Sequence, residues 1–133
     1  MAAPEAQVSP AGFDRLYGLE LVELGDQRAL ARVTVHDQLR RPTGPVHGGV
    51  YAAIAEGLAT IATERAVDGK MAVALSTQTS LLRPITQGTI HAAALARHRG
   101  RTTWVWEVEI TDDEGLLCAA CRVTIAIGDP PAV

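Results

Sequence analysis

The chain of 133 residues has few aromatic residues, few cysteines and no excess of basic charge, and each shortage excludes a class of protein. Aromatic residues make up 4% of the sequence while hydrophobic residues make up 47%, so a core has to be built mainly from Ala, Val, Leu and Ile. The net charge of −3 argues against a nucleic-acid partner, because binding to phosphates needs a basic surface. No apolar run reaches the roughly 18 residues of a membrane-spanning helix, so no membrane partner is expected.

The two cysteines, Cys118 and Cys121, lie in the stretch LLCAACRVTIAI. A redox C-x-x-C pair belongs at the start of a helix, whereas this stretch has the composition of a strand, on which residues three apart point to opposite faces. Both cysteines are therefore predicted to be small core residues. No cluster of His, Cys or carboxylate residues has metal-ligand spacing, so neither a metal nor another cofactor is expected.

The length allows one domain with a substantial core but not two ordinary domains. The opening MAAPEAQVSPAG lacks the basic start and apolar run of a signal peptide. We interpret residues 1–12 as a flexible N-terminal arm of a cytoplasmic protein. The domain is expected to cover residues 13–128, and residues 129–133 are expected to form a C-terminal tail.

The hydrophobic pattern predicts a long helix flanked by strands. This helix runs from Gly48 to about Val67 and is apolar almost all round, which is typical of a buried helix. A short helix ending at Gly18 and two strands joined around Gly25 precede it. Strand-like blocks follow at residues 71–83, 88–98, 102–112 and 116–127, and the short breaks between them predict antiparallel pairing of consecutive blocks.

A helix that is buried on nearly all sides needs a sheet that curves around it. We therefore predict an α+β fold in which a curved antiparallel sheet of about six strands wraps around one long central helix. The last block is apolar on both faces, so its outer face is expected to be covered as well. A second subunit is the simplest cover.

Gly48 and Gly49 open the long helix, and this position could carry chemistry. The first N–H groups of a helix have no partner within it, so they can bind an anion or the oxygen of a carbonyl under attack. Glycines there also let the backbone approach a ligand closely. The alternative is that the glycines only allow tight packing between loop and helix.

Glu56 is an acid in an alanine-rich part of the same helix. It shares a face with Thr60, Thr63 and Glu64, so these residues could form an ordinary solvated stripe. The turns before it contain almost no other polar side chain except Tyr51, which favours the alternative that the carboxylate serves catalysis.

Gly48 and Glu56 are eight residues apart, which is roughly 12 Å along a helix. A reacting carbonyl has to lie within roughly 3 Å of both its N–H donor and its attacking group. One helix can hardly supply both groups, whereas two antiparallel helices related by a two-fold axis can. A site shared between two subunits is therefore predicted.

The stretch GPVHGGVYAAIAEGLATIAT resembles the helix signature of hotdog-fold thioesterases of the phenylacetic-acid-degradation (PaaI) type. It is most similar to the branch of 4-hydroxybenzoyl-CoA thioesterases that carry a glutamate on the central helix. The resemblance covers about residues 15–127 and includes the HGG motif, the acid at this spacing and the strand order. It implies a hotdog fold, an acyl-CoA substrate and a homo-oligomer, either a dimer or a tetramer made of two dimers.

Carried over by position, the resemblance implies catalytic roles for three residues of the helix. Glu56 matches the catalytic carboxylate, acting as nucleophile or general base. Gly48 matches the glycine whose N–H polarises the thioester carbonyl, and Thr60 matches a threonine that helps to place water. Residues expected near the acyl part of the substrate are Arg41, His47, Gly49, Ser76 and Thr77, with His47 regarded as mainly structural.

Arg41 departs from the pattern of the resembled family, which usually has Asn or Gln at this point. An arginine has fixed donors and a permanent charge, so it could polarise the carbonyl or bind a carboxylate or phosphate. A shift of one residue would instead place Arg40 or Pro42 at the matching point.

The stretch HRGR and the hydroxyl residues after it resemble the part of the family near the nucleotide of coenzyme A. This similarity assigns Arg101, Thr102 and Thr103 to coenzyme binding, and guanidinium groups suit phosphates. The alternative is a solvated hairpin tip. Trp104 and Trp106, by contrast, are expected in the core or in an interface.

Taken together, the sequence predicts an acyl-CoA thioesterase that releases a free acid and coenzyme A. An acyl-CoA-binding or regulatory protein without turnover is the main alternative, and the departure at Arg41 keeps it open. A dehydratase fits less well, because Glu56 has no evident partner base in the helix motif. The acyl group stays open among aromatic, short and medium chains.

Overall fold

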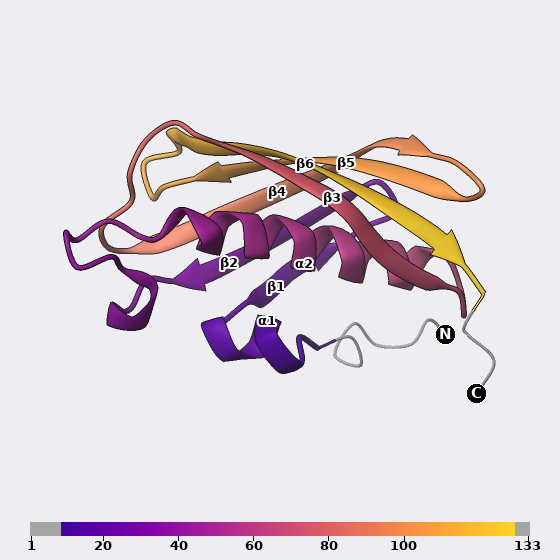
Figure 1. The fold of residues 1–133 in the computed structure, drawn as a ribbon, viewed down its shortest axis with the longest axis horizontal. Coiled ribbons are helices and arrows are strands. Elements are labelled where there is room, and N and C mark those ends of the chain that lie inside the picture. Colours follow the sequence, from indigo (N-terminus) through magenta and orange to yellow (C-terminus); the bar gives the residue numbers. More distant parts are fainter. Residues whose placement is uncertain (1–8, 130–133) are drawn as a thin grey trace.

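The computed structural model describes residues 9–129, which form one sheet, one long helix and one short helix (Figure 1). The elements in chain order are α1 (Gly12–Tyr17), β1 (Glu20–Leu24), β2 (Arg28–Thr34), a 3-10 turn (Asp37–Leu39), α2 (Gly48–Ala66), β3 (Met71–Leu81), β4 (Thr89–Arg99), β5 (Thr103–Thr111) and β6 (Leu117–Gly128). The predicted helices and strands are thus confirmed to within a few residues. The predicted arm and tail, residues 1–12 and 129–133, lie mostly outside the described residues.

All six strands belong to one antiparallel sheet with the order β1-β2-β4-β5-β6-β3. The sheet curves over α2, so the prediction of a curved sheet around a central helix is confirmed (Figure 1). The expected pairing of consecutive blocks is correct for β4–β5 and β5–β6 but wrong for β3 and β4.

The connection between β3 and β4 explains this error. It spans residues 82–88 and crosses the start of α2 instead of making a hairpin. Its Leu82 and Arg83 N–H groups donate to the Cys118 carbonyl, and its Ile85 carbonyl accepts from the Val46 N–H. β3 therefore reaches the far edge of the sheet, next to β6, while β4 pairs with β2.

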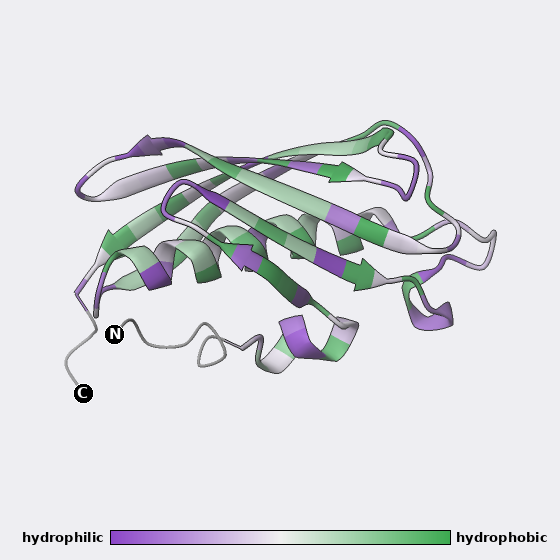
Figure 2. Ribbon diagram, turned by 180° about the vertical axis from the view of Figure 1, so that it is seen from behind, coloured by the Kyte–Doolittle hydropathy of each residue, from purple (hydrophilic) through white to green (hydrophobic). Residues whose placement is uncertain are grey.

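The core lies between α2 and the concave face of the sheet, where Ile54, Leu58 and the strand residues Val123 and Ile125 are fully buried. Burial of such aliphatic side chains is the main favourable contribution to folding. Figure 2 shows hydrophobic residues along α2 and the strands, with hydrophilic residues gathered at the hairpin ends.

Thr63 joins the helix to this core, so it does not belong to the solvated stripe that was one of the two alternatives for this face. Its side chain is fully buried. The hydroxyl donates to the Ala59 carbonyl at 2.7 Å and accepts from Trp106 Nε1 at 2.8 Å. The tryptophan side chains are buried as predicted, since Trp106 has no exposed surface and Trp104 has 5%. The indole N–H thus finds a partner inside the core, as a buried polar group requires.

Both cysteines are buried and free, as predicted for small core residues. Burial raises the pKa of each thiol, which keeps the thiols protonated and unreactive near neutral pH. Within residues 9–129, no helix is long and apolar enough to cross a membrane.

Candidate active site

The loop before α2 is fixed by backbone hydrogen bonds, and it sets the direction in which the helix starts. The His47 N–H donates to the Leu39 carbonyl at 2.8 Å, and the Val46 N–H donates to the Ile85 carbonyl at 2.8 Å. Arg40 and Val46 form an isolated antiparallel bridge. The start of the helix is therefore held between the 3-10 turn and the β3–β4 connection.

The first turn of α2 leaves one backbone donor free. His47 is the N-cap residue, and its Nδ1 accepts a hydrogen bond from the Gly49 N–H at 2.9 Å. In the neutral ring Nδ1 is therefore the acceptor and Nε2 carries the proton. The Gly48 N–H donates to no other group within the described part of the chain. Of the two predicted glycines, Gly48 has the available amide.

Gly48 also packs closely against the exposed Leu81 side chain, which would have to move to admit a larger residue. A Cβ atom at this position would lie 2.6 Å from Leu81 Cδ1, at the end of β3. At Gly49 a Cβ atom would lie 3.0 Å from His47 Nδ1, against the ring that caps the helix. Packing therefore explains in part why both positions are glycine. It does not explain the free N–H of Gly48.

Glu56 lies two turns further along α2 with its side chain exposed in the single subunit. Its Oε1 accepts a hydrogen bond from Thr77 Oγ1 at 3.4 Å. This distance is long for a hydroxyl donor, so the bond orients the carboxylate only weakly and leaves Oε2 available. Among the predicted residues, the structure brings Thr77 to the carboxylate, while Ser76 is exposed and makes no such bond.

Thr60 is one turn beyond Glu56 on the same face and is partly exposed. Such spacing places the two side chains side by side on a helix. Glu64 follows one further turn along, and partial burial raises the pKa of its carboxyl. The polar face of α2 is thus made of Glu56, Thr60 and Glu64, without the buried Thr63.

The two neighbouring arginines of the preceding loop have different surroundings. Arg40 is half-buried, forms an ion pair with Asp37 and donates from Nε to the Thr86 carbonyl at 2.7 Å. Arg41 is exposed, and within residues 9–129 its guanidinium has neither a hydrogen bond nor an ion pair. Only Arg41 is therefore free to bind a substrate or a second subunit.

The helix α1 packs beside Glu56, a feature that the sequence pattern did not reveal. Tyr17 donates from its hydroxyl to Asp14 Oδ1 at 3.0 Å and lies 3.3 Å from the Ala53 carbonyl of α2. A Cβ atom at Gly57 would collide with the Asp14 carboxylate, so a larger residue there would displace the Asp14 side chain. Desolvation raises the pKa of Asp14, and desolvation, Asp14 and Glu56 together raise the pKa of Tyr17. The glycine directly after Glu56 was the available signal for this contact.

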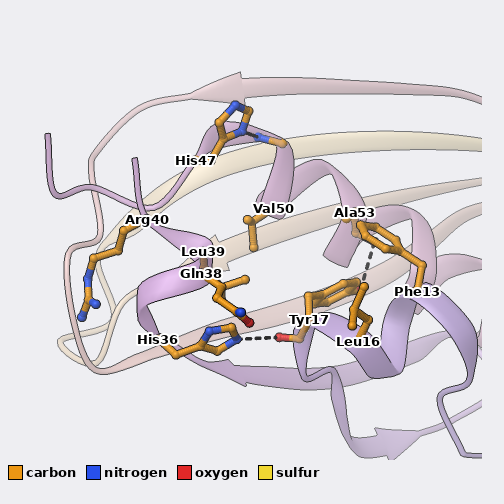
Figure 3. Close-up of a pocket in the computed structure, with 11 residues that line it drawn as sticks. Phe13, Leu16, Tyr17, His36, Gln38, Leu39, Arg40, His47, Val50 and Ala53 are labelled. Carbon is orange, nitrogen blue, oxygen red and sulfur yellow. Dashed lines mark hydrogen bonds between the residues drawn. The ribbon is translucent and has the colours of Figure 1, made fainter. Parts of the chain in front are cut away.

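An apolar groove lies between α1 and the first half of α2 (Figure 3). Its volume is about 750 Å³, and its floor is the segment of residues 36–40. The side chains and backbone that line it belong to Phe13, Leu16, Tyr17, His36, Gln38, Leu39, Arg40, His47, Gly49, Val50 and Ala53. The groove reaches the helix N-terminus at His47 and Gly49.

The residues predicted to bind the coenzyme lie at the other end of α2. Arg99 and Arg101 line a shallow pocket, and Lys70 lines it with them. The sequence did not predict a role for Lys70. The Arg99 guanidinium lies 4.6 Å from the centre of the Trp104 ring, which holds it in place by a cation–π contact. Thr102 is exposed at the hairpin turn, and Thr103 begins β5.

Comparison with known proteins identifies the family of this fold. The family model of the thioesterase superfamily matches residues 43–119, which include the loop, α2 and most of the later strands. The chain belongs to the thioesterase superfamily.

Curated relatives and solved structures agree with this assignment. The chain is 33% identical to a 1,4-dihydroxy-2-naphthoyl-CoA hydrolase of Listeria monocytogenes, over 87% of this chain and 95% of the relative. It is 34% identical to the proofreading thioesterase EntH of Cronobacter turicensis, over 83% and 81% of the two chains. A thioesterase structure from Haemophilus influenzae superposes with a TM-score of 0.83 at 30% identity, over 87% of this chain and 82% of the other.

The E. coli PaaI protein from the phenylacetic acid degradation operon superposes with a TM-score of 0.79 at 26% identity, over 85% of this chain and 81% of the other. The chain thus has the hotdog fold of the thioesterase superfamily, as expected, and it is a PaaI-like thioester hydrolase. Membership of this superfamily favours hydrolysis over the non-catalytic alternative.

Proposed function

We propose that this thioesterase hydrolyses the thioester bond of an acyl-CoA, with Glu56 as the catalytic carboxylate and the Gly48 N–H as the group that polarises the carbonyl. The observation that carries the proposal is that α2 combines a free amide at its tip with an exposed carboxylate two turns later. The relative from Listeria monocytogenes is named for the hydrolysis of an aryl-CoA ester. The proposal includes the branch of 4-hydroxybenzoyl-CoA thioesterases with a glutamate on the helix.

The chemistry follows from these two groups. The Gly48 N–H and the positive end of the helix stabilise the oxyanion that forms on the thioester oxygen. As a general base, Glu56 takes a proton from water while the water oxygen bonds to the carbonyl carbon. The C–S bond then breaks, and the proton goes to the departing thiolate. As a nucleophile, the carboxylate would bond to the carbonyl carbon and displace the coenzyme A thiolate, and water would cleave the resulting anhydride in a second step.

The remaining residues support this reaction. Thr77 orients Glu56 through its hydroxyl, and Thr60 holds the attacking water from the next turn. The His47 ring keeps the Gly49 amide occupied and so directs the carbonyl to Gly48. Arg41, with its free guanidinium, binds the carbonyl region or a charged part of the substrate.

Because Gly48 and Glu56 of one helix are roughly 12 Å apart, the proposal places the reacting carbonyl between two subunits. The free edge of the sheet supports such a dimer. Within residues 9–129, β3 pairs only with β6, and it exposes Val73, Leu75 and Leu81 at 51%, 64% and 61%. An uncovered edge strand of eleven residues with apolar side chains promotes association with another chain. Assembly of two dimers into a tetramer and a cytoplasmic location stay predictions.

The coenzyme is proposed to extend toward the pocket of Arg99, Arg101 and Lys70. Guanidinium and ammonium groups bind phosphate oxygens, and Thr102 and Thr103 add hydroxyl donors beside them. No cofactor takes part in the proposed reaction, in which coenzyme A is part of the substrate.

The direct test compares wild type with Glu56→Gln on a panel of acyl- and aryl-CoA esters, with release of free thiol as the readout. The substitution keeps the shape of the side chain and removes its charge. We expect kcat/KM to fall by about 10²- to 10⁴-fold for every ester that wild type hydrolyses. The matched control is Glu64→Gln, the same change two turns further along α2, which should leave kcat/KM within about two-fold. Equal turnover by wild type and Glu56→Gln would refute the role of this carboxylate.

A complementation experiment tests the shared site. Gly48→Pro removes the N–H at a helix position that accepts proline, combined with Leu81→Ala to relieve the close contact. Both this variant and Glu56→Gln should be inactive alone. After unfolding and refolding them together, mixed dimers contain one intact pair of groups, so activity should return to roughly a quarter of wild type. No recovery in mixed dimers would show that each site lies within one subunit.

A further inference from the structure

The connection between β3 and β4 supports the start of α2, and the turn between β5 and β6 holds this connection at both ends. At its beginning, the Leu82 and Arg83 N–H groups donate to the Cys118 carbonyl at 2.9 and 3.1 Å. Just past its far end, the Thr89 N–H donates to Asp113 Oδ2 at 3.1 Å. These segments gather at the end of the sheet where α2 begins (Figure 1).

Asp113 is exposed, yet two hydrogen bonds fix the direction of its carboxylate. Its Oδ1 lies 2.8 Å from His91 Nε2, and because an ionised carboxylate only accepts, this ring nitrogen carries the proton. Its Oδ2 lies against Gly88, whose φ of +86° favours glycine and where a Cβ atom would collide with the carboxylate. The hydrogen bonds from His91 and from the Thr89 N–H hold the pKa of Asp113 below its usual value, so the group is charged near neutral pH.

Between its two fixed ends, the connection supports the loop that leads into α2. The Ile85 carbonyl accepts from the Val46 N–H at 2.8 Å, and the Thr86 carbonyl accepts from Arg40 Nε at 2.7 Å. Val46 precedes Gly48 by only two residues. A displacement of the connection is therefore passed to the first turn of the helix through one hydrogen bond and a short piece of backbone.

We propose that Asp113 is a positioning residue, which holds the β3–β4 connection in place and thereby fixes the position of the Gly48 N–H. The proposal rests on the proposed function, in which this N–H polarises the thioester carbonyl. A donor stabilises the oxyanion best when it is in place before the reaction, and a displacement of about 1 Å caused by a distant mutation can lower the rate by about 100-fold. A polar hollow of about 400 Å³ separates residues 84–88 from residues 112–114, so the connection has room to move when the Asp113 carboxylate is removed.

Steady-state kinetics test this role on the CoA ester that wild type hydrolyses fastest, under conditions where circular dichroism shows each variant to be fully folded. Asp113→Ala removes both hydrogen bonds. We expect its kcat to fall about 5- to 50-fold while KM stays within about two-fold, because the Gly48 N–H binds the transition state more strongly than the substrate. Asp113→Asn keeps one acceptor oxygen, so its kcat should fall only about two- to fivefold.

The matched control is Glu114→Ala, which removes a carboxylate from the next residue of the same turn. In the part of the chain that the structure describes, the Glu114 side chain makes no hydrogen bond, and only its backbone N–H bonds, to Asp112. We therefore expect kcat and KM of this variant to match those of wild type. A purely structural role of Asp113 would lower the free energy of unfolding without changing kcat of the folded protein.

A second readout needs no turnover. In Glu56→Gln the ester should bind without being cleaved, and a hydrogen bond from the Gly48 N–H lowers the stretching frequency of its carbonyl, which infrared difference spectroscopy with a ¹³C-labelled carbonyl measures. Adding Asp113→Ala to Glu56→Gln should reduce this lowering by about half or more, because the donor is no longer held in line with the carbonyl oxygen. Adding Glu114→Ala instead should leave the frequency unchanged.

The outcomes separate this inference from the proposed function. An unchanged kcat and an unchanged carbonyl frequency in the Asp113 variants, with Glu56→Gln inactive, would overturn the positioning role and leave the thioesterase mechanism intact. A rise in KM without a fall in kcat would also overturn it, since that result indicates lost binding. If Asp113→Ala does not fold, Asp113→Asn decides by the same measurements. Full activity of Glu56→Gln would refute the mechanism itself and, with it, the role of the helix tip that Asp113 is proposed to support.

Discussion

Glu56 and Thr63 lie two turns apart on the same face of α2, yet their surroundings are opposite. Glu56 is exposed and has one long hydrogen bond, from Thr77. Thr63 is fully buried and has two short hydrogen bonds, one within the helix and one with Trp106 of β5. The helix therefore has a polar group bound in the core near its C-terminal end and an available polar group in its middle.

Under the proposed function, this difference assigns stability to Thr63 and catalysis to Glu56 on one helix. A buried polar group that is fully hydrogen-bonded fixes the position of its helix, because leaving its partner unsatisfied would be costly. A carboxylate that is loosely held keeps lone pairs for a proton or a carbonyl carbon. The Thr63–Trp106 contact helps to position α2 on the sheet, and the exposed Glu56 carboxylate is available for the proposed reaction.

Removing the core anchor should have the largest effect on stability. Trp106→Ala deletes a fully buried indole under α2, and we expect the free energy of unfolding to fall by about 3–5 kcal/mol. Urea unfolding followed by circular dichroism measures this loss. Leu95→Ala, at a residue 43% exposed on β4, is the control and should stay within about 0.5 kcal/mol. A loss below 1 kcal/mol for Trp106→Ala would mean that α2 is held elsewhere.

A pair of threonine substitutions should sharpen the contrast. Thr63→Val leaves Trp106 Nε1 without its acceptor and should lower the free energy of unfolding by about 1–3 kcal/mol, with kcat changed little. Thr60→Val, one turn beyond Glu56, should do the reverse and lower kcat while stability stays within about 0.5 kcal/mol. Urea unfolding and steady-state kinetics on one CoA ester measure both effects. If the two variants behave alike, the division of the helix is wrong.

The smallest effect concerns the contact of α1 with α2. Burial raises the pKa of Asp14 above its usual 3.8 in the folded protein, so the folded state binds this proton more tightly than the unfolded state does. This contribution favours folding below pH 3.8 and is lost as the pH rises through the raised value. Asp14→Asn removes the charge and keeps an acceptor for Tyr17.

Relative to wild type, Asp14→Asn should therefore gain stability between pH 3 and pH 7, by less than about 1 kcal/mol because Asp14 stays partly solvated. Thermal unfolding of both proteins at several pH values measures this difference. A difference that does not vary with pH would show that the carboxylate is not desolvated.

Much of the fold could be predicted from the sequence, because local patterns fix local structure. The apolar stretch from Gly48 onward gave the helix to within one residue of its observed end at Ala66. The strands followed from runs of apolar and β-branched residues between turns. Which strands lie side by side could not be predicted in the same way, since the position of β3 depends on where residues 82–88 cross the helix.

The candidate site could likewise be predicted only in part from the sequence. Glu56 and Gly48 could be recognised from motif and spacing, and their roles in catalysis stay predictions. His47 was regarded as mainly structural, and only the structure showed that it caps the helix. Thr63 was misplaced, because spacing along a helix says which residues share a face but not which part of that face the sheet covers. The position of α1 had no signal except Gly57.

By itself, the sequence determined the elements of this protein and placed an acid eight residues after a helix-opening glycine, because periodicity and turn residues act over a few neighbours in the chain. The tertiary structure alone decided that β3 forms a free edge, that Thr63 is bound to Trp106, and that α1 closes a groove beside α2. These features depend on contacts between residues far apart in the chain, which form only when the curved sheet packs onto α2.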